Sequence, residues 1–308
     1  MSKKPQNKSS HIIQSLVVNL LIAISKSVAA FMTHSGAMLA EAIHSFSDCA
    51  NQILLLVGVR QSQKAATARH PLGQGRAIYF WSFMVAMLLF SIGGMFSIYE
   101  GIHKFNMPEP IQHVSWGIGI LFFSLLLESY AMYSNIVEMN VIRGKLSFMK
   151  YLRATKDSDL VVVFGENSAA VFGLIVALVA MLASYYTGDS RYDAAGSFCI
   201  GVILICVAIF LSVEVKSLLI GESASDEILQ SVNDILQKHA EVIKLINCIT
   251  IQQGPGEVMM CMKIKCAHNF TALELSKLIN KLEHEIRSGS PEVKWLYVEP
   301  DAQEWKEK

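Results

Sequence analysis

Two polar side chains able to bind a metal ion lie four residues apart in an otherwise apolar stretch: His44 and Asp48. In a helix this spacing puts both on one face, so an imidazole and a carboxylate could hold a divalent ion together. A structural hydrogen bond that joins two helices is the alternative. Because an aspartate inside a bilayer costs several kcal/mol, we favour the metal interpretation.

A second apolar stretch supplies partners for this pair. Glu166 is its strongest ionisable candidate, and Asn167 adds a neutral oxygen ligand. Glu166 could instead be a solvated carboxylate near the cytoplasmic interface. Small residues around it would let another helix approach closely: Gly165, Ala169, Ala170 and Gly173.

Other polar residues in apolar stretches are weaker candidates. Glu128 could relay protons, support the metal ligands or pack helices. Asn19 and Lys26, one heptad apart, could cross-link helices or neutralise a carboxylate. Glu214 and Lys216 are expected at the membrane interface.

The elements that must position these residues are membrane helices. The 308 residues are 52% hydrophobic and 17% charged, below the roughly 25% charge of soluble domains. A net charge of zero with no clustered basic face argues against nucleic-acid binding. Six cysteines without a CxxC pair predict reduced thiols. Six stretches are long enough to cross a bilayer, where only helices satisfy the backbone: 12–33, 37–59, 78–101, 114–137, 160–187 and 192–219.

Lysine and arginine in the connections predict the orientation. The N-terminal tail and the second and fourth connections together carry twelve, against two in the remaining connections. Both termini are therefore expected in the cytoplasm. The first apolar stretch is too long for a signal peptide, so we expect it to be retained. Short loops and no presequence favour a bacterial cytoplasmic membrane.

The chain beyond residue 221 has the texture of a small α+β domain. Thr271 and Glu274 predict a capping box at the start of a helix. We therefore expect a transmembrane domain at 1–221 and a cytosolic, ferredoxin-like αββαβ domain at 222–308. Its expected elements are a helix at 226–240 behind Ser225, strands at 245–252 and 258–267 around a turn at 254–256, a helix at 271–287 and a strand at 293–299.

Three segments resemble the cation diffusion facilitator family. The stretch 35–48, SGAMLAEAIHSFSD, is similar to the second helix of these transporters. The stretch 70–77, HPLGQGRA, is similar to their loop between helices two and three, and 193–197, DAAGS, to the start of their sixth helix. The resemblance covers nearly the whole chain. It implies a homodimer, joined through the C-terminal domain and membrane helices, that exports Zn²⁺ or a related ion in exchange for protons.

The resemblance also implies a site with residues from helices two and five. By position these are His44 and Asp48, with Glu166 where the family commonly has His or Asp. The second fifth-helix position is occupied by Ala170, a departure that leaves fewer ligands. The Glu-Asn pair resembles the branch with the mitochondrial-type zinc transporter, which has Glu-Asp, so Asn167 removes one charge.

Two peripheral metal sites of the family lack some of their usual histidines in this sequence. His70 is a candidate for a loop site, but Gln74 stands where a second histidine is often found. We expect the C-terminal domain to dimerise by packing, without bridging metals. Three positions of the family's histidine-rich site carry other residues: Asn247, Met262 and Val298.

The sequence thus predicts a membrane transporter for divalent cations, most simply Zn²⁺, with no enzymatic activity and no resident cofactor. His44 is the expected proton-coupling residue, since imidazole titrates near neutral pH. A Mn²⁺, Fe²⁺ or Co²⁺ exporter of the same fold, an organic-cation binder and a degenerate, non-transporting member remain alternatives. A membrane metal enzyme would need a nucleophile or a further histidine at the same depth, and none is present.

Overall fold

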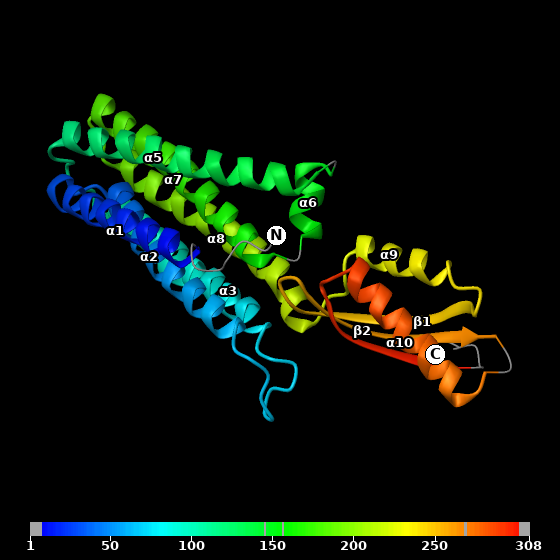
Figure 1. Cartoon of the computed structure of the whole chain (residues 1–308). Helices are drawn as coiled ribbons and strands as arrows, with labels where there is room; N and C mark the ends of the chain where they lie inside the picture. Colours follow the sequence, from blue (N-terminus) through cyan, green and yellow to red (C-terminus); the bar gives the residue numbers. More distant parts are fainter. Residues whose placement is uncertain (1–7, 145, 156, 268–269, 302–308) are drawn as a thin grey trace. The chain divides into compact units, whose positions relative to one another are not determined.

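The computed structural model describes residues 8–144, 146–155, 157–267 and 270–301 (Figure 1). These residues form two compact units. The first unit comprises the chain up to Arg60 and Ile78–Lys216; the second comprises Gln61–Ala77 and Ser217–Lys308. The domain boundary expected after residue 221 stays a prediction. Some residues of the charge count, namely Lys3, Lys4, Lys145 and Lys156, lie outside the described ranges.

The membrane bundle consists of helices that match the six predicted spans. Five are long and apolar enough to cross a bilayer, and the described apolar part of the other, α1, is the shorter stretch Asn19–Thr33. Long helices run side by side, with α5 against α7 and α1 (Figure 1). In chain order the spans are α1 (Lys8–Thr33), α2 (Gly36–Ser62), α3 with η2 and α4 (Ala77–Asn106), α5 (Val114–Ile142), α7 (Ser158–Thr187) and α8 (Arg191–Ile220).

The third span differs from a continuous α-helix. It consists of α3 (Ala77–Leu88), a π-helical segment η2 (Leu89–Met95) and α4 (Phe96–Asn106). Its backbone lies against α8: a Cβ atom at Gly101 would be 2.6 Å from the Phe198 nitrogen. The hydrophobic pattern did not predict this segment, nor the short helix α6 (Phe148–Ala154) between α5 and α7.

The start of α2 is tied to the start of α8. The Asp193 carboxylate accepts hydrogen bonds from the Ser35 hydroxyl (2.6 Å) and the Gly36 backbone nitrogen (2.5 Å). A carboxylate at a helix N-terminus satisfies free N–H groups and complements the helix dipole. Asp193, which follows Gly36 by 157 positions in the sequence, therefore fixes the beginning of α2, the helix that carries His44 and Asp48.

The second unit confirms the predicted αββαβ order. It contains α9 (Asp226–Leu236), β1 (Val242–Gly254), β2 (Glu257–Cys266), α10 (Ala272–Gly289) and β3 (Val293–Pro300). The sheet order is β1-β2-β3, with β1 antiparallel to β2 and β2 parallel to β3. A parallel pair needs a crossover connection, which α10 provides.

The predicted N-terminal cap is confirmed in full for α10 and in part for α9. Thr271 caps α10 through the predicted box: its hydroxyl accepts from the Glu274 nitrogen (3.3 Å), while the Glu274 carboxylate accepts from the Thr271 nitrogen (2.8 Å). Ser225 is the N-cap of α9, but its side chain makes no cap hydrogen bond, and α9 ends at Leu236, four residues before the predicted end.

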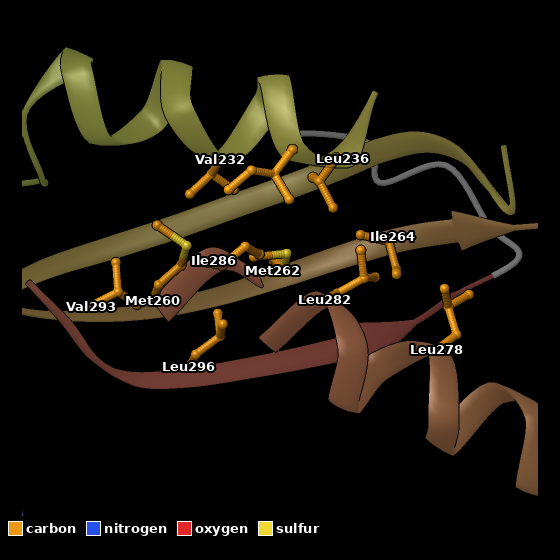
Figure 2. Close-up of a cluster of buried hydrophobic side chains, with 11 residues drawn as sticks. Val232, Leu236, Met260, Met262, Ile264, Leu278, Leu282, Ile286, Val293 and Leu296 are labelled. Carbon is orange, nitrogen blue, oxygen red and sulfur yellow. The ribbon is translucent and has the colours of Figure 1, made fainter. Parts of the chain in front are cut away.

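An apolar core lies between the sheet and its two helices. Alternate residues of β2 face this core, as the two-residue period of a strand requires. Figure 2 shows side chains of α9 and α10 meeting those of the strands. The core contains Val232, Ile235, Leu236, Met260, Met262, Ile264, Leu278, Leu282, Ile286, Val293 and Leu296.

The connection between α2 and α3 belongs to this second unit. Gly75 lies so close to the end of β1 that a Cβ atom there would be 2.5 Å from the Gln253 carbonyl oxygen. The neighbouring Arg76 guanidinium donates to the Leu219 carbonyl. This connection carries His70, whose side chain is exposed and whose backbone nitrogen donates to Thr67.

Candidate metal site in the membrane bundle

A cavity of about 490 Å³ lies between the helices that carry the predicted ligands. Asp48 lines it from α2, Glu128 from α5, and Glu166 and Asn167 from α7. Asn19, one of the weaker candidates, lines it from α1. The structure therefore places five polar residues predicted from the sequence around one cavity in the bundle.

His44 lies beside this cavity rather than on its lining. Its ring is fully buried, and its Nδ1 atom is 3.6 Å from Asp48 Oδ1. That separation exceeds the range of a good hydrogen bond. The helical spacing thus brings the imidazole and the carboxylate together, as predicted, but leaves the pair loosely joined.

Several buried polar atoms here have no hydrogen-bond partner within the described residues. They are both ring nitrogens of His44, Oδ1 of Asp48 and Oε1 of Glu166. Buried polar groups are nearly always hydrogen-bonded, because leaving one unpaired is costly. A group of unpaired lone pairs on three neighbouring side chains is therefore compatible with a cation that these atoms could share.

The candidate ligands do not form a closed metal site in this structure. Across the part of the chain that the structure describes, no three His, Cys, Asp or Glu side chains are close enough to hold a metal ion together. The ligands on α2 and α7 line a common space without converging on a point. Metal binding there would need side-chain movement toward the cavity or a bridging water.

Asn51 was missed by the sequence interpretation. It follows Asp48 by three positions and His44 by seven, so the three residues share one helix face. Its side chain is fully buried next to Glu166. The repeat His44, Asp48, Asn51 was the signal that could have found it.

Lys26 fulfils its predicted role, with a partner that the sequence interpretation did not identify. Its ammonium group is fully buried, 3.0 Å from Glu41 Oε2 and 2.9 Å from the Ser45 hydroxyl. It therefore neutralises a carboxylate and cross-links α1 to α2, as expected. Glu41 precedes His44 by three residues, which places it near the metal candidates.

The remaining predicted positions lie elsewhere. Lys216 is exposed and Glu214 half-buried near the end of α8. In the C-terminal sheet, Met262 belongs to the apolar core and Val298 packs against it, while Asn247 lies beside an irregularity of β1. The absence of bridging metals in this domain stays a prediction.

Comparison with known proteins identifies the family. The family model for the cation efflux transmembrane domain matches residues 12–220. The Homo sapiens protein named proton-coupled zinc antiporter SLC30A9, mitochondrial, is 30% identical over 249 residues, which are 80% of this chain and 44% of that protein. The chain therefore spans less than half the length of this relative.

Plant and bacterial relatives extend the comparison. Metal tolerance protein C4 of Arabidopsis thaliana is 29% identical over 253 residues, which are 82% of this chain and 55% of that protein. Cation-efflux pump FieF of Yersinia pestis (strain Pestoides F) is 25% identical over 270 residues, which are 86% of this chain and 83% of that protein. The chain belongs to the cation diffusion facilitator family and resembles its mitochondrial-type zinc-transporter branch.

Proposed function

We propose that the protein exports a divalent cation, Zn²⁺ in particular, across the membrane in exchange for protons, through a site between α2 and α7. The observation that carries this proposal is the cavity of about 490 Å³ with Asp48 on one wall and Glu166 on the other. Two carboxylates facing one space inside a membrane bundle are costly to keep, and a divalent cation balances their charge.

The donor set favours zinc among the divalent ions. His44, Asp48 and Glu166 offer one imidazole and two carboxylates, and Asn167 or a water could complete a tetrahedron. Imidazole with carboxylates suits Zn²⁺, Co²⁺ or Fe²⁺ better than Mg²⁺ or Ca²⁺, which prefer oxygen ligands alone. Mn²⁺, Fe²⁺ and Co²⁺ are therefore the second candidates.

Protons compete with the metal for the same atoms. Binding of a cation requires ionised Asp48 and Glu166 and an unprotonated His44 nitrogen. When the site faces the more acidic side, protons displace the ion, and when it faces the other side, the cation displaces the protons. Alternating access then gives antiport without a separate device. Glu128, on the same cavity, is the proposed proton relay.

The proposed assembly is a homodimer with both termini in the cytoplasm. The orientation rests on the excess of lysine and arginine in three of the connections. Short loops support a bacterial cytoplasmic membrane, although the relatives include both a mitochondrial protein and a bacterial one. Protons that enter the cytoplasm down their gradient would drive the cation from the cytoplasm outward.

The first test is metal uptake into proteoliposomes under an imposed proton gradient. Zn²⁺, Mn²⁺, Co²⁺ and Mg²⁺ are compared, with Asp48→Ala as the blank and Glu227→Ala, an exposed carboxylate on α9, as the matched control. We expect gradient-dependent Zn²⁺ flux in the wild type and the control, and none in the blank. Flux of no metal above the blank would refute transport and favour a degenerate or organic-cation-binding protein.

A second experiment tests the coupling residue. If protons compete at His44, the His44→Ala variant should lose the dependence of Zn²⁺ flux on the proton gradient. Full retention of gradient-driven transport in this variant would contradict the assignment.

A further inference from the structure

The buried ion pair of Lys26 and Glu41 lies outside the proposed metal site but next to it. Both side chains are fully buried, and Lys26 Nζ is 3.0 Å from Glu41 Oε2. The Ser45 hydroxyl accepts a second bond from Lys26 at 2.9 Å. Lysine and glutamate are almost never fully buried unless they are paired, and ionisable side chains inside a membrane bundle are costly and usually functional.

Glu41 also reaches a third helix. Its second oxygen, Oε1, has no hydrogen-bond partner among the described residues. It points at α7: a Cβ atom added to Gly173 would be 2.3 Å from it. The carboxylate therefore occupies space that a side chain at position 173 would otherwise take. One ion pair contacts α1, α2 and α7.

The ion pair is close to the proposed ligands along both helices. Glu41 precedes His44 by three residues, a rise of about 4.5 Å. Gly173 follows Glu166 by seven residues, a rise of about 10.5 Å. The Lys26 ammonium donates to Ser45, which adjoins His44 and precedes Asp48 by three residues in α2. At such separations in a medium of low dielectric constant, an unbalanced unit charge changes cation affinity about tenfold or more.

We propose that Lys26 and Glu41 are a charge-balanced pair of positioning residues that sets the electrostatic background for cation binding at the α2–α7 cavity. While both charges are present, their fields at the cavity oppose each other, and the carboxylates of the cavity dominate what the cation meets. Loss of either charge exposes the other to the site. This inference rests on the proposed transport function, in which Zn²⁺ is the cation whose binding the two charges affect.

The opposite signs of the two charges give the test. In Glu41→Gln, the unpaired Lys26 ammonium repels the cation, and the KM for Zn²⁺ rises about tenfold or more. In Lys26→Met, the Glu41 carboxylate attracts the cation at a pH that keeps this buried group ionised, so KM falls there and turnover slows because release is hindered. The double variant removes both charges and returns KM close to the wild-type value. A pair that only held helices together would impair both single variants in the same direction.

Control variants separate charge from folding. Lys26→Arg keeps the charge and should keep KM near the wild-type value. Asp193→Asn breaks a different polar tie, at the start of α2, and should lower the melting temperature without the opposite KM shifts. Monodispersity in detergent shows which variants fold. Shifts of KM in one direction for both single variants, no shift in either, or a double variant no better than the worse single would overturn the proposal.

Equilibrium Zn²⁺ binding to the detergent-solubilised chain distinguishes the two proposals. Opposite shifts of affinity in the single variants, without flux in the wild type, would refute transport and keep the charge pair. Wild-type flux without those opposite shifts would refute the charge pair alone. A wild type that neither transports nor binds Zn²⁺ would refute both.

Discussion

The membrane bundle and the C-terminal domain differ in how deeply they bury ionisable side chains. The bundle buries Lys26, Glu41, His44 and Glu166 among apolar helices. The C-terminal domain packs eleven apolar side chains into one cluster, and its buried polar side chains, such as His239 and Gln252, lie outside that cluster. It keeps charges at its edge, where the partly exposed Lys263 ammonium lies 3.0 Å from Glu299. Fully buried Lys and Glu side chains thus occur in the membrane bundle, whereas the described Lys, Glu and Asp side chains of the C-terminal domain stay at least partly exposed.

The difference follows from the two solvents. In water, burial of apolar area drives folding at about 25 cal/mol per Å², so an apolar core is also a stable one. Between membrane helices that driving force is absent, because lipid is as apolar as the side chains. A buried charge in the bundle therefore adds cost without improving the packing. Such residues should be needed for transport, whereas the core residues of the C-terminal domain should be needed for stability.

The largest effect is expected at Glu166. Glu166→Gln removes one proposed ligand charge, and breaking a buried charge interaction costs about 3 kcal/mol. Zn²⁺ flux in proteoliposomes should fall about 100-fold. The melting temperature should not fall, because the lost carboxylate was buried at a cost. Glu128→Gln, on the same cavity, serves as a control with a smaller loss of flux and an altered pH profile. Equal flux in Glu166→Gln and wild type would contradict the assignment.

The complementary experiment shortens an apolar side chain in the core of the C-terminal domain. Leu282 is fully buried, so Leu282→Ala should lower the free energy of unfolding by about 2–5 kcal/mol. Leu273 lies on the same helix but is 66% exposed, so Leu273→Ala should change stability by less than about 0.5 kcal/mol. Differential scanning calorimetry measures both, and folded Leu282→Ala should keep the wild-type KM for Zn²⁺. A tenfold KM change would show that the two units do not separate stability from transport.

A gain of function would sharpen the comparison. Ala170 lines the cavity one turn from Glu166, at the position where the family resemblance leads us to expect a ligand. Ala170→Asp should increase Zn²⁺ affinity about tenfold, since it adds a carboxylate to the donor set. Ala170→Asn, of the same size but uncharged, is the control. Equal affinities of the two variants in equilibrium dialysis would argue that Ala170 does not face the metal.

The smallest effect concerns Glu285 at the edge of the C-terminal domain. His239 Nε2 lies 2.9 Å from its carboxylate, and this contact holds the pKa of Glu285 below its usual value. A lowered pKa in the folded state contributes stability above the unfolded pKa of about 4.3, and this contribution is lost as the pH falls through the folded pKa. Glu285→Gln should therefore melt slightly below wild type at pH 7 and together with it near pH 3. Glu227→Gln is the exposed control, and a difference that grows in acid would contradict this sign.

Sequence patterns predicted the spans and the αββαβ order well, because apolar length and strand period are local properties. They also predicted the face of α2 that carries His44 and Asp48, since four-residue spacing fixes it. The partner of Lys26 is a tertiary choice between several carboxylates, and its spacing within α1 cannot distinguish them. The cavity arises where α1, α2, α5 and α7 meet, so its outline depends on helix packing that no single stretch encodes.

The π-helical segment Leu89–Met95 has a consequence for how the third span tolerates length changes. A π-turn accommodates one residue more than an α-turn, so deletion of one residue there could restore a regular α-helix. The residues after the deletion would keep nearly the same orientation around the helix axis, because the wider π-turn had already absorbed the extra residue. A deletion in a regular α-helix would instead rotate them by about 100°. Gly101 would therefore keep its contact with Phe198 after a deletion within Leu89–Met95, but would leave it after a deletion within Ala77–Leu88. The π-helical segment thus lets the third span contain one additional residue while Gly101 keeps facing α8.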